Sequence, residues 1–163
     1  MEDIIEQIVQ IEKGAFGLGG VNRVTIKSIL KVFKKGLITI TKDNLVIGYL
    51  GWEKHLKNKF PPYNHKLEYT HDDLGKFAYV SIITVEKEYR SQGIGTRLLE
   101  MLSKRAKEEE CTKLYCPVNQ KHPYLKKGVM HFWKKNGFKI TGEVRWGLAK
   151  DKFIPSYIFT KYL

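Results

Sequence analysis

Apolar residues recur along this chain with two different periods, and these periods predict an alternation of helices and strands. From residue 94 to residue 106 the apolar positions follow helical spacing, with charged residues between them. The run just before, residues 77–85, is rich in β-branched and aromatic residues, which favour a buried strand. The pattern therefore predicts a core strand followed by an amphipathic helix that ends near Glu109.

The same reasoning predicts the other elements of the chain. Expected helices are residues 3–13, 25–34 and 129–135, and expected strands are residues 37–41, 45–52, 113–118, 138–148 and 153–162. The strand at 113–118 follows a helix, so a right-handed crossover should place it parallel to the strand at 77–85. The result is an α/β fold with a mixed central sheet and helices on both faces.

One long polar segment, residues 53–76, interrupts this alternation. It contains Pro61, Pro62 and three histidines, and it exceeds the usual length of a connection. Two interpretations stay open: a mobile surface loop, or a flap that covers a substrate.

Length and composition indicate one cytoplasmic domain, residues 1–163. The hydrophobic content of 42% argues against disorder, and no long uncharged apolar run predicts a membrane span. The first residues, MEDIIEQ, are acidic where a secretory signal is basic. Cys111 and Cys116 do not combine with His122 and His131 at the spacing of a zinc module, so we expect reduced thiols and no metal.

The net charge of +12 comes mainly from lysines that are dispersed over the whole chain. Such dispersion is typical of a solvated surface. The alternative is attraction to a polyanion, including RNA or a ribosome, and the pattern supports it only weakly.

Residues 90–95, Arg-Ser-Gln-Gly-Ile-Gly, lie between the predicted strand and the first turn of the predicted helix. Backbone N–H groups at a helix start lack intrahelical partners and attract anions. Gly93 and Gly95 have no Cβ to obstruct a diphosphate, and Arg90 and the Thr96 hydroxyl add donors. No Lys-Ser/Thr pair, third glycine or acidic ribose partner follows, which disfavours P-loop and dinucleotide-binding folds.

The segment VEKEYRSQGIGTRLL, residues 85–99, resembles motif A of the GCN5-related N-acetyltransferase (GNAT) family, Q/R-x-x-G-x-G/A between a strand and a helix. Residues 129–138, VMHFWKKNGF, are similar to the next helix of that family and its terminal Gly-Phe. The resemblance implies the GNAT fold, in which the parallel strand pair is splayed at the cofactor site. It also implies acetyl-CoA-dependent transfer of an acetyl group, by direct attack in a ternary complex, to a primary amine of a protein N-terminus, a lysine or a small molecule.

The resemblance also implies which residues hold the cofactor. Main-chain groups at the end of the strand should pair with the pantetheine arm, and the amides of residues 91–96 should hold the diphosphate. The implied cofactor-binding residues are Ile83, Thr84, Val85, Arg90, Ser91, Gln92, Gly93, Ile94, Gly95, Thr96, Asn119 and Trp133.

The catalytic residues depart from the family pattern. A tyrosine commonly serves as the acid in the helix after motif A, but Trp133 occupies that position, and an indole is no useful proton donor. Tyr124 is the preferred substitute, ahead of His122 and His131, although it fits a packing role equally well.

Some members of the family carry a glutamate base on the strand before motif A, and Tyr79 occupies that position here. The candidate carboxylates, which the sequence does not rank, are Glu12, Glu53, Glu68, Asp72 and Asp73. The competing hypothesis is a non-catalytic module of the same fold that binds CoA or nucleic acid.

Overall fold

A computed structural model describes residues 2–122, 125–149 and 152–163. Its strands form a six-stranded sheet in the order β1-β2-β3-β4-β6-β5, and β3 and β4 are its parallel pair. The strands are β1 (Leu37–Lys42), β2 (Leu45–His55), β3 (Phe77–Val85), β4 (Lys113–Asn119), β5 (Lys139–Ala149) and β6 (Lys152–Tyr162). The helices are α1 (Glu2–Phe16), α2 (Arg23–Val32), α3 (Ile94–Glu108) and α4 (Met130–Lys135).

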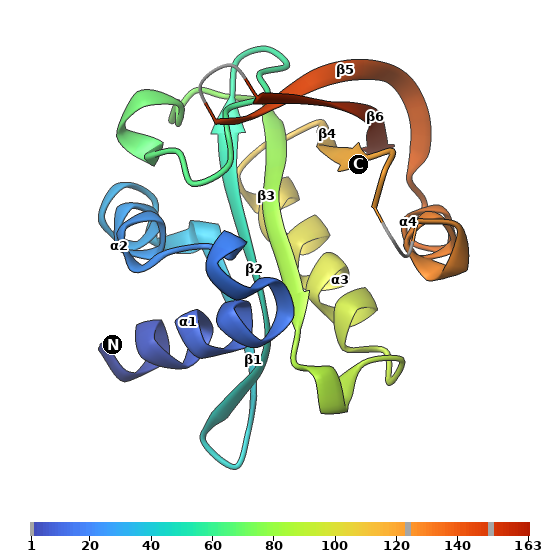
Figure 1. Cartoon of the computed structure of the whole chain (residues 1–163). Helices are drawn as coiled ribbons and strands as arrows, with labels where there is room; N and C mark the ends of the chain where they lie inside the picture. The colour runs from blue at the N-terminus through green and yellow to red at the C-terminus, as the bar shows by residue number, and fades with distance from the viewer. Residues whose placement is uncertain (1, 123–124, 150–151) are drawn as a thin grey trace.

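Helices cover both faces of this sheet (Figure 1). A Cβ built on Gly48 of β2 would meet Ile94 and Leu98, so that face packs on α3. On the opposite face, the Thr84 hydroxyl of β3 donates a hydrogen bond to Glu12 of α1. The α/β fold with a mixed sheet, predicted from the sequence, is confirmed.

The parallel strands β3 and β4 stay together for only three residue pairs. Phe77, Ala78 and Tyr79 pair with Lys113, Leu114 and Tyr115, and the two strands then diverge. Beyond that point β3 remains paired with β2 up to Val85, and β4 remains paired with β6 up to Asn119. A gap therefore opens in the middle of the sheet, as the family resemblance implied.

Several boundaries differ from the predicted ones, each for a local reason. Helix α2 begins two residues earlier than predicted because the Asn22 side chain accepts a hydrogen bond from Thr25 N, 3.0 Å away, and caps it. Strand β2 continues to His55, because Glu53 and His55 are paired with β3 and fully buried despite their polarity. A π-helical turn, Leu125–Val129, precedes α4.

The segment after β2 is packed against the sheet, which argues against the mobile loop, while the flap that covers a substrate stays a prediction. Leu67 is 1% exposed, and the Glu53 carboxylate accepts hydrogen bonds from His65 Nε2 and the Thr70 hydroxyl, both at 2.6 Å. Burial raises the pKa of Glu53, but the His55 and His65 imidazoles and the Thr70 hydroxyl outweigh it and lower that pKa to about 2. A buried carboxylate therefore anchors this segment.

Across the described ranges of the chain, no helix has both the length and the apolar character needed to cross a bilayer.

Candidate active site

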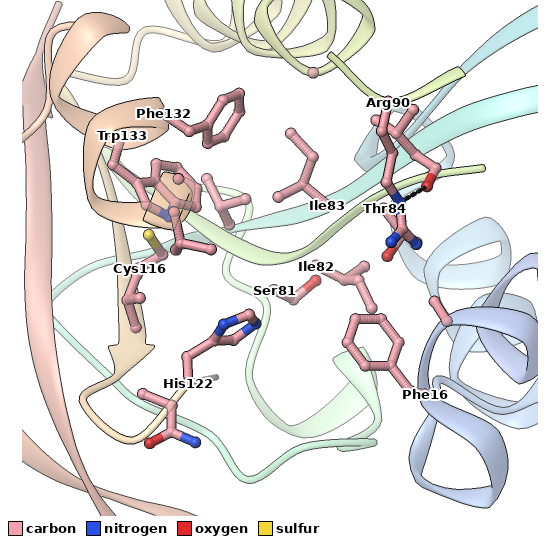
Figure 2. Close-up of a pocket in the computed structure, with 18 of the residues that line it drawn as sticks. Phe16, Ser81, Ile82, Ile83, Thr84, Arg90, Cys116, His122, Phe132 and Trp133 are labelled. Atoms are coloured by element: carbon pink, nitrogen blue, oxygen red, sulfur yellow. Dashed lines mark hydrogen bonds between the residues drawn. The ribbon is translucent and has the colours of Figure 1, made fainter. Parts of the chain in front are cut away.

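A cavity of about 1020 Å³ occupies the gap where β3 and β4 diverge (Figure 2). It reaches from the side of α3 and α4, where Ile94, Phe132 and Trp133 line it, to the side of α1, where Phe16 and Thr84 line it. The cavity is thus a passage through the sheet.

Alternate side chains of β3 face the two sides of this passage. Thr84 faces α1, because its hydroxyl reaches Glu12. Val85 is opposite Gly48, the position that faces α3, and Ile83 lies on the same side by alternation. One strand therefore contributes to both mouths of the passage.

The start of α3 opens directly on the α3 side of the passage. Arg97 N donates to Gly93 O at 3.0 Å, so the N–H groups of Ile94, Gly95 and Thr96 come before the first hydrogen bond of the helix. Ser91 has a φ of 60° and Gly93 a φ of 81°, so two left-handed residues shape the turn that leads into α3. This end of the cavity suits an anion.

The two glycines of the motif have different structural roles. Gly93 adopts the left-handed conformation, and a Cβ added there would meet open space. At Gly95, in contrast, an added Cβ would lie 2.9 Å from the Phe132 ring of α4. Gly93 is needed for the turn, whereas Gly95 is needed for close packing between α3 and α4, which the sequence did not predict.

All of the implied cofactor-binding residues except Gln92 line this cavity. The Gln92 side chain is exposed and donates to Glu88 O at 2.9 Å. Arg90 is held at the rim, because its Nε donates to Val85 O at 3.0 Å, the bond drawn in Figure 2. Trp133 is 6% exposed and packs edge-on against Phe138, with ring centroids 4.9 Å apart, so much of it belongs to the core.

Tyr79 is not among the residues that line this passage. Tyr79 is 1% exposed, stacks on His55 with ring centroids 5.2 Å apart, and adjoins a separate cavity of about 10 Å³. Burial, with smaller contributions from Cys116 and Glu53, raises its pKa well above the ordinary value. The other tyrosine candidate, Tyr124, lies outside the described residues.

His122 lines the passage, and its ring points into the cavity (Figure 2). Burial lowers the pKa of this imidazole below its usual value. Among the described residues of the lining, it is the side chain whose ordinary pKa lies closest to neutrality. The sequence ranked His122 behind Tyr124, because nothing local shows which residues after β4 turn inward.

Glu12 of α1 lies just behind the α1 mouth of the passage and is 1% exposed. Its carboxylate accepts hydrogen bonds from the Thr84 hydroxyl at 2.6 Å, Val21 N at 2.9 Å and the Tyr63 hydroxyl at 3.3 Å. Burial and then the Glu12 charge raise the pKa of Tyr63, so this hydroxyl keeps its proton. Both hydroxyl-bearing residues line the cavity, and one carboxylate fixes them both.

Aromatic side chains that the sequence did not single out complete the α1 mouth. Trp146 Nε1 donates to Pro61 O at 2.8 Å, and the Trp146 and Tyr63 rings meet edge-on with centroids 6.1 Å apart. Phe16, at the end of α1, is 48% exposed at the same mouth. These residues come from segments far apart in the chain, and only the tertiary fold brings them together.

No metal site emerges from the described residues, where no three His, Cys, Asp or Glu side chains gather in a suitable arrangement. Cys111 and Cys116 are both buried free cysteines.

The gap between β3 and β4, with the free N–H groups at the start of α3 beside it, is a feature by which a class of proteins can be recognised. The family comparison identifies the class: the acetyltransferase (GNAT) family model matches residues 20–138. The chain belongs to the GNAT acetyltransferase family.

Solved structures with the same fold include three that cover nearly the whole chain. The GphF GNAT-like decarboxylase in complex with isobutyryl-CoA has a TM-score of 0.82 at 12% identity, over 99% of this chain and 96% of that one. Ard1 from Thermoplasma volcanium has a TM-score of 0.75 at 16% identity, over 100% and 93%. Ribosomal-protein-alanine N-acetyltransferase from Brucella melitensis has a TM-score of 0.71 at 16% identity, over 100% and 96%. A search of curated protein sequences finds no match.

Proposed function

We propose that this protein is an acetyl-CoA-dependent N-acetyltransferase that acts on a primary amine. The observation that carries the proposal is the start of α3, which opens on a passage through the sheet between β3 and β4. Family membership supports acyl transfer, and the Brucella structure is an N-acetyltransferase by name.

The residues at the α3 mouth suit the diphosphate of CoA. Free N–H groups of residues 94–96, the open approach at Gly93 and the Arg90 guanidinium supply donors and positive charge. Beyond Tyr79, the edge of β3 no longer pairs with β4, so the main-chain groups of residues 83–85 on that edge are available to the pantetheine arm, apart from Val85 O, which accepts from Arg90 Nε. Acetyl-CoA, when bound, supplies an acetyl group activated as a thioester.

His122 is the residue that we assign to proton transfer. Its lowered pKa keeps the imidazole uncharged at neutral pH, ready to accept the proton that the attacking amine loses. The ammonium first releases one proton to solvent; the imidazole takes the second proton as the amine attacks and returns it to the departing thiolate, so one ammonium and one acetyl-CoA give one amide, one thiol and one released proton. Burial alone accounts for the lowered pKa of His122. None of the other ionisable side chains of the described lining therefore causes it; these are Tyr63, Tyr89, Arg90, Cys116 and Lys135.

The proposal is tested by incubating the purified protein with acetyl-CoA and a panel of primary amines, while recording both free thiol and the acetylated product by mass spectrometry. We expect thiol release that requires an acceptor, with one acetylated amine per thiol. Tight CoA binding without acetylated product would refute the proposal and favour a non-catalytic binding module. Carbon dioxide release from a carboxylated acyl-CoA without an acceptor would instead favour a decarboxylase.

A further inference from the structure

We infer that the amine of the acceptor is carried by an uncharged, apolar group. This inference rests on the proposed function and specifies its substrate class. It depends on the difference in chemistry between the two mouths of the passage.

The α3 mouth is the end with free main-chain donors, set beside its apolar side chains. It presents the main-chain donors at the start of α3 together with Arg90, and a diphosphate fits there. The opposite mouth is left for the second substrate, because the two reactants must meet at the gap between β3 and β4. The chemistry of the α1 mouth therefore selects the acceptor.

The α1 mouth is lined mainly by apolar and aromatic side chains: Phe16, Tyr63, Ile82, Trp146 and Ile154. Thr84 adds a hydroxyl, but that hydroxyl already donates to Glu12. An alkyl or aryl group next to the amine gains contact with these walls. Aromatic ring faces also accommodate a single ammonium before it loses its proton.

The charges around the passage disfavour a polycation. No carboxylate belongs to the described part of the lining, and the charged residues there, Arg90 and Lys135, are both positive. The nearest buried carboxylate, Glu12, is engaged by three donors and lies behind the wall. A polyamine or aminosugar would bring several ammonium groups into a site without counter-charges, on a protein with a net charge of +12.

The apolar wall is also fixed in place. Glu12 holds Tyr63, and the hydrogen bond from Trp146 to Pro61 O joins the β5–β6 hairpin to the segment that carries Tyr63. Because these side chains are already in place before the acceptor binds, no binding free energy is spent on ordering them, and the wall selects acceptors by their shape.

The test compares two sets of acceptors at one acetyl-CoA concentration. The apolar set contains 2-phenylethylamine and a peptide with a free N-terminus and apolar first residues, which separates small amines from peptide ends. The polycationic set contains spermidine and kanamycin. We expect kcat/KM for at least one apolar acceptor to exceed that for both polycations by about tenfold or more.

A charge reversal at the mouth sharpens the test. Phe16→Glu should lower kcat/KM for the apolar acceptors and raise it for spermidine, while Phe16→Leu keeps the preference for apolar acceptors. Phe153→Glu is the matched control, since Phe153 is 55% exposed and lies outside the described lining. CoA affinity, measured by calorimetry, reports whether each variant is folded, and Ile154→Glu replaces Phe16→Glu if that variant loses CoA binding.

Each outcome separates the substrate class from the proposed function. Efficient acetylation of polycations, with the apolar amines poor, overturns the inference and leaves the N-acetyltransferase intact. A preference that does not move in the glutamate variants while CoA affinity is retained also overturns it. Absence of acetylated product with every acceptor overturns the proposed function, and the inference with it.

Discussion

Replacing Gly93 by aspartate tests whether the start of α3 holds the diphosphate of CoA. Gly93 has a φ of 81°, and a side chain placed there would project into open space. Asparagine has the same shape, and both residues tolerate the left-handed conformation better than other side chains do. Gly93→Asn is therefore the matched control, and the two variants differ only in the negative charge.

The size of the effect follows from Coulomb's law. Two unit charges about 4 Å apart interact by about 1 kcal/mol in bulk water and by about 4 kcal/mol at an effective dielectric constant of 20. Because Gly93 is exposed, the value should lie near the lower end, at about 1–2 kcal/mol of binding free energy. We expect Gly93→Asp to raise the Kd for CoA by about 5- to 30-fold relative to Gly93→Asn.

Isothermal titration calorimetry with CoA gives the two constants, and thermal unfolding shows whether the variants share the same loss of stability. The difference between them should shrink at about 1 M salt, where the screening length falls to about 3 Å. Equal CoA affinities for the aspartate and asparagine variants at low salt would contradict a diphosphate bound at this helix start.

Three further predictions concern buried ionisable groups. In a pH–rate profile, kcat/KM should fall as the pH drops through the lowered pKa of His122. The His122→Gln variant should have a lower kcat/KM that does not show this fall at low pH. In urea unfolding, Glu12→Gln should lower the free energy of unfolding by about 1–3 kcal/mol, because hydrogen bonds to a neutral amide are weaker than those to a carboxylate and the Thr84 hydroxyl must turn to accept instead of donating. An unchanged midpoint would show that the carboxylate is dispensable. Glu53, with its pKa lowered from 4.5 to about 2, should stabilise the fold by about 3 kcal/mol above pH 4.5 and lose this as the pH falls toward 2. Unfolding measured against pH checks this, since Glu53→Gln should lack the dependence.

The sequence predicts best where the information is local. The strand Phe77–Val85 and the helix after it follow from apolar spacing, and the motif between them is continuous in the chain. The residues that line the α3 side of the passage are therefore almost all predictable, with Gln92 the exception because a turn residue can point either way.

The acceptor side follows poorly from the sequence because its residues meet only through the tertiary fold. Helical spacing places Glu12 on the buried face of α1 with Ile5 and Ile8, but nothing local identifies its partners, which are 9, 51 and 72 positions away. Tyr79 occupies a catalytic position when residues are counted along β3. The pairing of β3 with β2 shifts beside Gly51, however, and Tyr79 lies among buried aromatic rings and does not line the passage.

The shared carboxylate of Glu12 has a consequence for anyone who redesigns this protein. Exchanging the segment that carries Tyr63, as one would to change acceptor choice, removes one of three donors from a group that water does not reach. The replacement must supply its own hydroxyl or amide at that point, or Glu12 loses a partner and its hydrogen bond with Thr84 shifts, which displaces the strand that we propose binds the acetyl donor. Acceptor choice and acyl-group positioning are thus coupled traits, and variants with altered selectivity should be screened for both at once.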